Sequence, residues 1–358
     1  MRGLISFLFG NYFSITNNLM IAVADNTTIY LLCPANLSTG GPEELHQLGA
    51  QLNSIGRKVF MCYDNYDKEK NTSPVHDSYK KYNVPFCFEV ENNKNNIVIF
   101  PETYSHKVWD KEFSKTQKVI WWMSVVFYLK TLENTKKRFE KKKFYSIKKY
   151  FKNYPVPTVK KLRDSAINHI AHSYFSLDFL RKNNIKVIGQ ISGYMDEIFH
   201  DDKDLKSRKE NLIIYNALKN GEFLNKIIKL TPHLNWLGLQ GMTLQEIADW
   251  MARAKVYIDF GFHPGREKMP REACLLDCCL ISGKQGSAQF KEDMPIPDEY
   301  HFVDSEQNIP AIISKIEDCL EHFEDKIKDF EHYKNLISNE KKLFEESVNS
   351  IFKTNINL

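Results

Sequence analysis

The sequence lacks the features of a membrane-spanning, repetitive or disulfide-stabilised protein. No apolar run approaches the ~20 residues of a transmembrane helix, and there is no internal repeat or low-complexity tract. The seven cysteines are odd in number, none has C-x-x-C spacing, and several lie in apolar runs. This usage indicates buried, reduced thiols in a cytoplasmic protein. Cys274 and Cys278 are one helical turn apart, but no histidine or second cysteine pair has zinc spacing, so we expect no metal site and no cofactor.

The first 27 residues have the outline of a secretion signal without its uninterrupted apolar core. Arg2 precedes an apolar run at 4–9 and small residues follow at 22–24, but polar residues such as Asn11 and Asn17 interrupt the stretch between them. We interpret residues 1–27 as an N-terminal extension that rests on the protein or on a membrane surface.

The net charge of the whole chain is small, but one segment is strongly basic. The net charge is +4 over 358 residues, which is too small to indicate a nucleic-acid-binding protein. Residues 130–163, however, hold thirteen basic residues and two acidic ones, a charge of +11, so the rest of the chain carries −7. We call residues 130–163 the basic segment.

Aromatic side chains are interleaved with the lysines of the basic segment, Phe139, Tyr145 and Phe151 among them. This pattern suits an anionic membrane surface, or an anionic ligand such as a lipid diphosphate or a polysaccharide. Single-stranded nucleic acid is a competing ligand that we consider unlikely. An exposed lysine-rich helix whose aromatic residues face the core is a further alternative.

Short apolar runs alternate with amphipathic ones in two successive series. We expect strands at residues 29–33, 58–62, 96–100, 118–123 and 185–188, and then at 211–215, 234–237, 255–260 and 278–282. Helices are expected at 222–229, from Thr243 (with Glu246 as its capping-box partner) to Ala254, and at 270–277, with one or two more between 309 and 352. The alternation predicts an α/β fold of two Rossmann-like domains that face each other across a cleft, with C-terminal helices.

The composition shifts also predict the domain boundaries. A first domain would span 28–199 and contain the basic segment, a charged linker would follow at 200–210, and a second domain would span 211–330. A C-terminal helix is expected at 331–358. In open α/β sheets, ligands bind at the carboxyl ends of the strands, so the loops after the strands are the places to look for a site.

Arginine is rare, with nine residues against forty lysines, yet three arginines lie within nineteen residues: Arg253, Arg266 and Arg271. Arginine makes bidentate phosphate contacts, and glycines such as Gly261 and Gly265 let the backbone approach a ligand closely. The helix expected to begin near Pro270 would direct its N-terminal amides to the same place. Arg266, Lys268 and this helix N-terminus could therefore hold a diphosphate; a solvated basic turn is the alternative.

Four short motifs resemble a known family. They are Gly40-Gly41-Pro42-Glu43 after the first strand, Trp121-Trp122-Met123-Ser124 after a middle strand, Tyr215-Asn216-Ala217-Leu218-Lys219 at the start of the second series, and the block HPGREKMPREACLLDCCLISGKQGS from His263 to Ser287. Together they resemble the GT-B glycosyltransferases of family 4, and most closely a subgroup that builds bacterial surface polysaccharides.

The resemblance implies a retaining, metal-independent transfer of a sugar from a nucleotide-diphosphate donor to a surface polysaccharide or lipid-linked glycan. The donor-binding residues it implies are Gly40, Gly41, Asn216, Lys219, Gly241, Arg266, Lys268, Glu272, Gly286 and Ser287. Glu272 would contact the donor ribose. The acceptor-side residues would be Trp121, Trp122, Ser124 and Glu102. The candidates for catalytic residues are His263, Glu272, Asp259 and His106.

The chain departs from the family's pattern at one position. The family has two glutamates eight positions apart, and eight positions before Glu272 stands Pro264. His263, Asp259 or Glu267 would take the place of the first glutamate, which holds the donor sugar. A catalytically silent GT-B-like protein that binds or assembles glycans is therefore the alternative function. The acceptor base is open among His46, Glu102, His106 and His263. We expect a cytoplasmic protein, and peripheral binding at the inner face of a membrane is compatible with this expectation.

Overall fold

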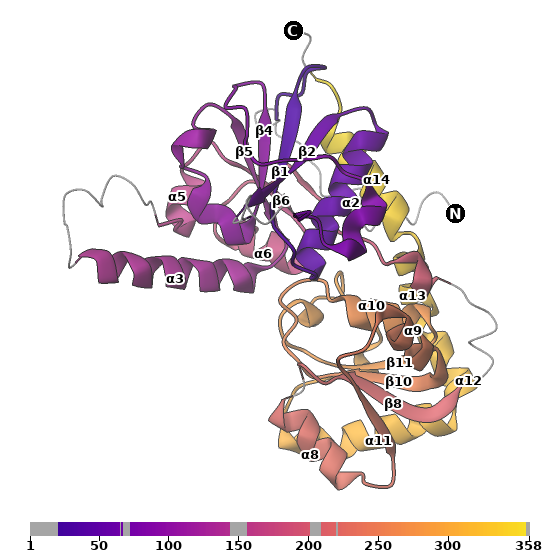
Figure 1. Cartoon of the computed structure of the whole chain (residues 1–358). Helices are drawn as coiled ribbons and strands as arrows, with labels where there is room; N and C mark the ends of the chain where they lie inside the picture. The colour runs from indigo at the N-terminus through magenta and orange to yellow at the C-terminus, as the bar shows by residue number, and fades with distance from the viewer. Residues whose placement is uncertain are drawn as a thin grey trace.

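The structure is a computed structural model, and it describes residues 21–64, 66, 72–143, 156–200, 209–219 and 221–355. Residues 1–20 of the expected N-terminal extension lie outside this range, as do residues 144–155 of the basic segment and 201–208 of the expected linker. Two parallel sheets, each covered by helices, make up the described part of the chain (Figure 1).

The first sheet has seven parallel strands in the order β3-β2-β1-β4-β5-β6-β7, which is the Rossmann order extended by one strand. Its strands are β1 (Thr28–Pro34), β2 (Lys58–Asp64), β3 (Phe86–Cys87), β4 (Ile97–Pro101), β5 (Gln117–Trp122), β6 (Asn168–Ala171) and β7 (Gly189–Gln190). Every residue of β4 is buried. Such continuous apolar strands are typical of parallel sheets with both faces covered.

The helices of this half are α2 (Gly40–Ser54), α3 (Val125–Lys143), α5 (Val159–Arg163) and α6 (Tyr174–Lys182). Leu45, Leu48 and Leu52 of α2 pack into the core on one face of the sheet. Tyr128 of α3, Leu162 of α5 and Leu180 of α6 pack into a second core on the other face. The sheet is thus buried between two layers of helices.

The second sheet has five parallel strands in the order β12-β11-β10-β8-β9, the flavodoxin-like order 2-1-3-4-5 counted along this half. Its strands are β8 (Glu210–Asn216), β9 (Asn235–Leu239), β10 (Ala254–Asp259), β11 (Cys279–Gly283) and β12 (His301–Phe302). The helices that follow are α8 (Glu222–Leu230), α9 (Leu244–Arg253), α10 (Lys268–Leu275), α11 (Ile309–Glu321), α12 (Phe323–Lys326), α13 (Glu331–Ser338) and α14 (Glu340–Phe352).

The α/β fold with two parallel sheets confirms the sequence-based prediction, and the predicted capping box of Thr243 and Glu246 is present at α9. Three details of that prediction are wrong. The expected strand at 185–188 is absent, because the edge strand β7 begins at Gly189; β6, with its Asn168 and His169, was not predicted. Helix α10 begins at Lys268, which makes Pro270 its third residue. Four helices, α11 to α14, replace the one or two expected after Ile309.

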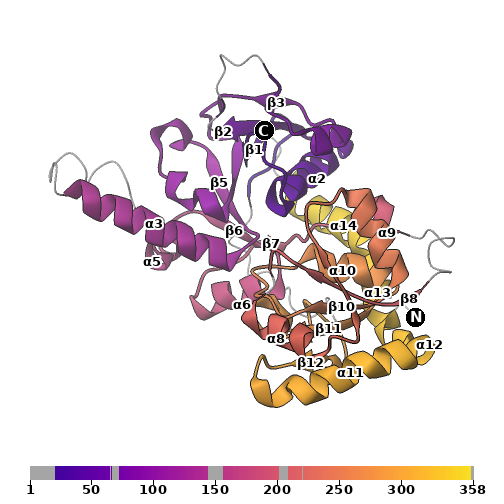
Figure 2. The same ribbon diagram turned by 60° about the horizontal axis from the view of Figure 1, so that its bottom comes forward.

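The last helix returns to the first half of the molecule. Phe344, Val348 and Phe352 of α14 are buried in the core beside α2, and the two helices lie side by side in both views (Figures 1 and 2). The side chain of Asn355 then bonds the backbone of Ile21 and Val23. The chain therefore crosses between the halves twice, once before β8 and once before α14.

Helix α3 projects away from the rest of the molecule (Figure 1). Its first turns are anchored by Val125 and Tyr128, which are buried, whereas Lys136, Lys137 and Arg138 are exposed. None of the helices in the described ranges is long and apolar enough to span a membrane. The outer part of α3 thus presents basic side chains to the surroundings.

Candidate functional site

Loops at the carboxyl ends of both sheets meet between the two halves. Met123 follows β5 of the first sheet, and Gly265 lies in the loop after β10 of the second. A Cβ atom on Gly265 would lie 2.5 Å from the carbonyl oxygen of Met123, so only glycine fits at this approach of the two backbones. We call the surroundings of this contact the interdomain region.

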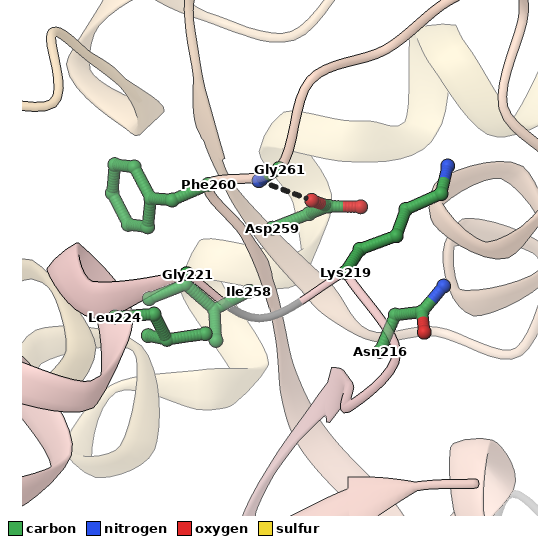
Figure 3. Close-up of a pocket in the computed structure, with 8 residues that line it drawn as sticks. All are labelled: Asn216, Lys219, Gly221, Leu224, Ile258, Asp259, Phe260 and Gly261. Carbon is green, nitrogen blue, oxygen red and sulfur yellow. Dashed lines mark hydrogen bonds between the residues drawn. The ribbon is translucent and has the colours of Figure 1, made fainter.

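A pocket opens on the second half beside this region (Figure 3). It is lined by Asn216, Lys219, Gly221, Leu224, Ile258, Asp259, Phe260 and Gly261. Gly221 and Leu224 come from the start of α8, and the others come from the carboxyl ends of β8 and β10 and the loops after them. These two strands are adjacent, and the order of the second sheet reverses between them. Open α/β sheets bind their ligands at such a switch point.

Two lysines of the interdomain region pair with glutamates. Lys219, after β8, pairs with Glu267, and Lys268, the first residue of α10, pairs with Glu43 on α2. Glu43 also accepts a hydrogen bond from the hydroxyl of Tyr82 at 3.1 Å. The side chains of the four paired residues are 18–31% exposed. The pair of Lys268 and Glu43 therefore joins the two halves at a partly buried point.

Arg266, expected to bind phosphate, and Arg271 share a carboxylate of the last helix. Glu340 of α14 accepts from Arg266 at 2.7 Å and from Arg271 at 2.8 Å, and the Arg271 side chain is fully buried. Arg271 also donates to the carbonyl oxygen of Gly193 at 3.1 Å. The guanidinium of Arg271 thus links the two halves. Arg266 is engaged in the same ion-pair cluster, so among the predicted phosphate ligands Lys219 and Lys268 have their ammonium groups nearer the surface.

Glu272 is the fifth residue of α10, past its first turn, and is 7% exposed. Burial raises its pKa to about 7, although the positive charges of Lys268 and Arg271 act in the opposite direction. A buried carboxyl beside two cations suits an acceptor of hydrogen bonds from hydroxyl groups.

Asp259 and His263 form a buried pair in the loop after β10. The Nε2 atom of His263 lies 3.4 Å from Asp259, and Asp259 accepts hydrogen bonds from Tyr257 at 3.2 Å and from the backbone of Gly261 at 2.8 Å. Burial alone would raise the pKa of Asp259, but His263, the Gly261 amide and Lys219 lower it below its usual value. His263 is 1% exposed, and a substrate reaches this ring only if the loop moves.

Gly286 and Ser287 contact the backbone of the same loop, at His263 and Gly265. The amide of Ser287 donates to the carbonyl oxygen of His263 at 2.8 Å, and its hydroxyl donates to that of Gly265 at 2.5 Å. Gly286 has φ +65°, and a Cβ there would lie 2.0 Å from the His263 carbonyl oxygen. These two residues therefore position the loop of His263 and Gly265.

The predicted acceptor-side residues lie around the end of β5. Trp121 and Trp122 are fully buried; Trp121 donates to the carbonyl oxygen of Ile191 at 3.1 Å, and Trp122 donates to His169 at 3.0 Å. Neither ring is exposed to an acceptor in this structure, and the assignment of the two residues to the acceptor side stays a prediction. They are core residues because a central strand of a covered sheet buries both of its faces.

Glu102 and Ser124 lie close to this strand end. Glu102 accepts a hydrogen bond from the Met123 amide at 3.1 Å, and burial raises its pKa to about 8. Ser124 accepts from the Phe127 amide at 3.2 Å and so caps α3. Glu102 thus supports the backbone of Met123, the residue that meets Gly265.

The remaining predicted residues are more scattered. Gly40 and Gly41 begin α2; a Cβ on Gly40 would lie 3.7 Å from Lys268, and one on Gly41 would lie 3.7 Å from Met123. Gly241, with φ +65°, follows β9. The ring of His106 packs edge-on against Tyr104 in the 3-10 turn Glu102–Lys107.

His46 is a buried structural residue. Its ring nitrogens lie 2.6 Å from the Pro42 carbonyl oxygen and 2.8 Å from the Tyr63 hydroxyl. Burial, the strongest influence on this ring, lowers its pKa. Both ring nitrogens of His46 thus have partners within the chain, and its role as a candidate acceptor base stays a prediction.

The sequence analysis did not identify the buried pair of Glu44 and His172. Their side chains lie 2.9 Å apart and link α2 to the residue after β6. Burial alone would raise the pKa of Glu44, but the charge and hydrogen bond of His172 lower it. Glu44 directly follows the Gly40-Gly41-Pro42-Glu43 motif and so could have been singled out from the sequence. Its partner His172 could not, because the strand before it, β6, was not predicted.

Comparison with solved structures identifies the fold. No family model matches this sequence, and no curated protein matches it significantly. The structure is similar to that of HepE from Anabaena in complex with UDP-glucose, with a TM-score of 0.60, 10% identity, and coverage of 90% of this chain and 98% of that one. It is also similar to WaaG, a glycosyltransferase involved in lipopolysaccharide biosynthesis (TM-score 0.52, 10% identity, 91% and 100% coverage).

A third similar structure is the catalytic domain of starch synthase IV from Arabidopsis thaliana bound to ADP and acarbose (TM-score 0.51, 11% identity, 92% and 100% coverage). These neighbours share two Rossmann-like domains, and the chain accordingly has the GT-B fold. The prediction of that fold is confirmed.

Proposed function

We propose that this protein is a glycosyltransferase that moves a sugar from a nucleotide-diphosphate donor to a surface polysaccharide or a lipid-linked glycan. The proposal depends on one observation: Lys219, Lys268 and Glu272 lie beyond the carboxyl ends of strands β8 and β10 in a GT-B fold. The neighbour solved with UDP-glucose and the one solved with ADP support the choice of donor class.

The donor's diphosphate would be held by Lys219 and Lys268. Both ammonium groups belong to the loops at the switch point, and the first amides of α10 lie beside them. When the bond between sugar and phosphate breaks, negative charge grows on the leaving diphosphate. Two lysines and a helix N-terminus stabilise that charge electrostatically, and on this basis we propose a metal-independent transfer. The resemblance to the family implies that the transfer is retaining.

Glu272 would accept hydrogen bonds from the ribose hydroxyls of the donor. The position of the family's first glutamate is occupied by Pro264, so the donor sugar must be held by other groups. Asp259 and Glu267 remain our candidates, since both lie within the loop that carries Gly261 and Gly265. Glu267 already contacts Lys219 and is therefore beside the proposed diphosphate position.

We further propose that the acceptor is delivered at an anionic membrane surface by the basic segment. The exposed basic residues of α3 lie on a helix that projects from the first half (Figure 1). Phe127 and Leu129, 47% and 46% exposed, add apolar side chains near its base. Basic and apolar side chains on one exposed helix suit the headgroup region of an anionic bilayer.

Donor hydrolysis tests the proposal. The protein is incubated with UDP-, GDP-, ADP- and CMP-sugars, and release of the nucleotide is followed together with the thermal shift that each nucleotide causes. One nucleotide sugar should be hydrolysed slowly and should raise the melting temperature. Binding without any turnover, with acceptors present, would favour the catalytically silent alternative. No binding and no turnover with any nucleotide would contradict the proposal.

A further inference from the structure

The two lysines that we assign to the donor diphosphate are each already paired with a carboxylate of this chain. Glu267 pairs with Lys219 and Glu43 pairs with Lys268. A phosphate oxygen that binds either ammonium group must compete with that carboxylate, because both are anionic acceptors for the same N–H groups. Both glutamates lie in motifs that carry the resemblance, Glu43 in Gly40-Gly41-Pro42-Glu43 and Glu267 in the block from His263 to Ser287, but the resemblance gives neither of them the role of a lysine's partner.

The surroundings of Glu43 hold its carboxylate in place. Tyr82 donates to one oxygen at 3.1 Å, while Lys268 binds the other. Glu43 is 18% exposed and Lys268 24% exposed, so the pair is partly shielded from water. Partial burial strengthens an ion pair relative to one on an open surface.

Glu267 occupies the N-cap position of α10, directly before Lys268. Its side chain makes no capping hydrogen bond and extends to Lys219 instead. An anionic oxygen from a glutamate therefore lies beside the N-terminus of α10, where a phosphate oxygen would also be favoured.

We propose that Glu43 and Glu267 are masking carboxylates that set the affinity of this site for its anionic ligand. The proposal rests on the proposed function. Donor binding exchanges the two carboxylates for two phosphate groups, and in doing so breaks the ion pair of Lys268 and Glu43 that joins the two halves. Only a ligand with at least two anionic groups can replace both carboxylates, which selects a diphosphate.

Isothermal titration with inorganic pyrophosphate tests the masking without depending on the nucleotide. In Glu43→Gln and in Glu267→Gln, pyrophosphate should bind roughly two- to tenfold more tightly than in the wild type, because one competing charge is gone. Glu306→Gln is the matched control: it removes the same charge from an exposed pair with Lys226 on the second half and should leave the affinity unchanged.

A double-mutant cycle assigns the effect to the pair. In a Lys268→Gln background, Glu43→Gln should no longer tighten pyrophosphate binding, because the lysine that it masks is absent. Equal tightening in both backgrounds would contradict the proposal and would indicate a general effect of net charge. Thermal unfolding of each variant verifies that it is folded.

The outcomes for masking and for function are separable. Unchanged or weaker pyrophosphate binding in both Glu43→Gln and Glu267→Gln overturns the masking, even where UDP-sugars bind the wild type and the proposed function stands. Tighter pyrophosphate binding with no preference for any nucleoside diphosphate supports the masking and contradicts the proposed function. Absence of pyrophosphate binding in the wild type and in both variants overturns the masking.

Discussion

Glu272 is a buried acid at the fifth position of α10, where the charge of Lys268 acts on it. Removing its carboxyl group should remove the acceptor that we assign to the ribose hydroxyls. We predict that Glu272→Ala weakens the binding of the cognate nucleoside diphosphate by at least about tenfold, the cost of one lost hydrogen bond to a charged group. Isothermal titration measures this, with Glu306→Ala as a control at an exposed position. Unchanged affinity would exclude Glu272 from the site.

Glu102 gives the stability of the protein a pH dependence of known sign. Burial raises its pKa to about 8, so the folded protein holds the proton more tightly than the unfolded chain. A carboxyl group of this kind contributes its full stability below its unfolded pKa of ~4.3 and loses it as the pH rises through about 8.

We therefore predict that Glu102→Gln gains stability relative to the wild type between pH 5 and pH 9, by about 4 kcal/mol. The amide is neutral at both pH values and keeps an oxygen for the Met123 amide. Urea denaturation at the two pH values measures the difference. If the variant and the wild type shift equally with pH, Glu102 does not titrate in this range.

At the scale of elements, α14 fixes α10 through one carboxylate. Glu340 binds both Arg266 and Arg271, and its replacement by glutamine would leave two largely buried guanidinium groups short of a counter-charge. We predict that Glu340→Gln lowers the free energy of unfolding by about 3–5 kcal/mol. Denaturant unfolding is the measurement, and Glu346→Gln, at an exposed position on the same helix, should change it by less than ~0.5 kcal/mol. Similar effects of the two changes would show that the ion-pair cluster does not hold the helices.

Helix α3 carries the membrane prediction. Reversing Lys136, Lys137 and Arg138 to glutamate should weaken binding to anionic vesicles by about a hundredfold or more, since each basic residue near such a surface contributes about 1 kcal/mol. Co-sedimentation with vesicles over a range of salt concentrations measures the loss. The matched control reverses three exposed lysines elsewhere: Lys182, Lys291 and Lys328. Equal losses in both triple variants would indicate an effect of net charge alone, and binding that ignores salt would contradict the prediction.

Elements with local signals were predictable from the sequence. The Thr243–Glu246 capping box depends on residues three positions apart, and β1, β4 and β10 are short apolar runs. Strand β6 was missed because Asn168 and His169 interrupt its apolar character; only the packing of Trp122 against His169 in the folded chain explains why a histidine lies there. The sequence also could not indicate which face of β5 its tryptophans occupy, since both faces are buried.

At the scale of the whole molecule, the residues that join the halves are far apart in the sequence. Arg266 and Glu340 are separated by 74 positions, and Lys268 and Glu43 by 225. The hydrophobic periodicity of the sequence does not predict such ion pairs, because they depend on how the two sheets face each other. The donor site stays a prediction, and the partners of Arg266, Lys219 and Lys268 became visible only in the folded chain.

The charge distribution follows the same division. The basic segment lies in the first half, on and after α3, whereas the lysines that we assign to the diphosphate belong to loops of the second half. An acceptor held on one half and a donor on the other would meet where Met123 approaches Gly265. This arrangement is the basis of the central claim, that the interdomain region binds a nucleotide-diphosphate sugar through Lys219 and Lys268.

Titration of the protein with the panel of nucleoside diphosphates, in the wild type and in Lys219→Gln/Lys268→Gln, tests that claim most directly. The account predicts that one nucleoside diphosphate binds the wild type and that its affinity falls by about a hundredfold in the double variant, with the corresponding monophosphate binding more weakly. Equal affinity in the wild type and the double variant, or no binding of any nucleoside diphosphate to the wild type, would contradict it.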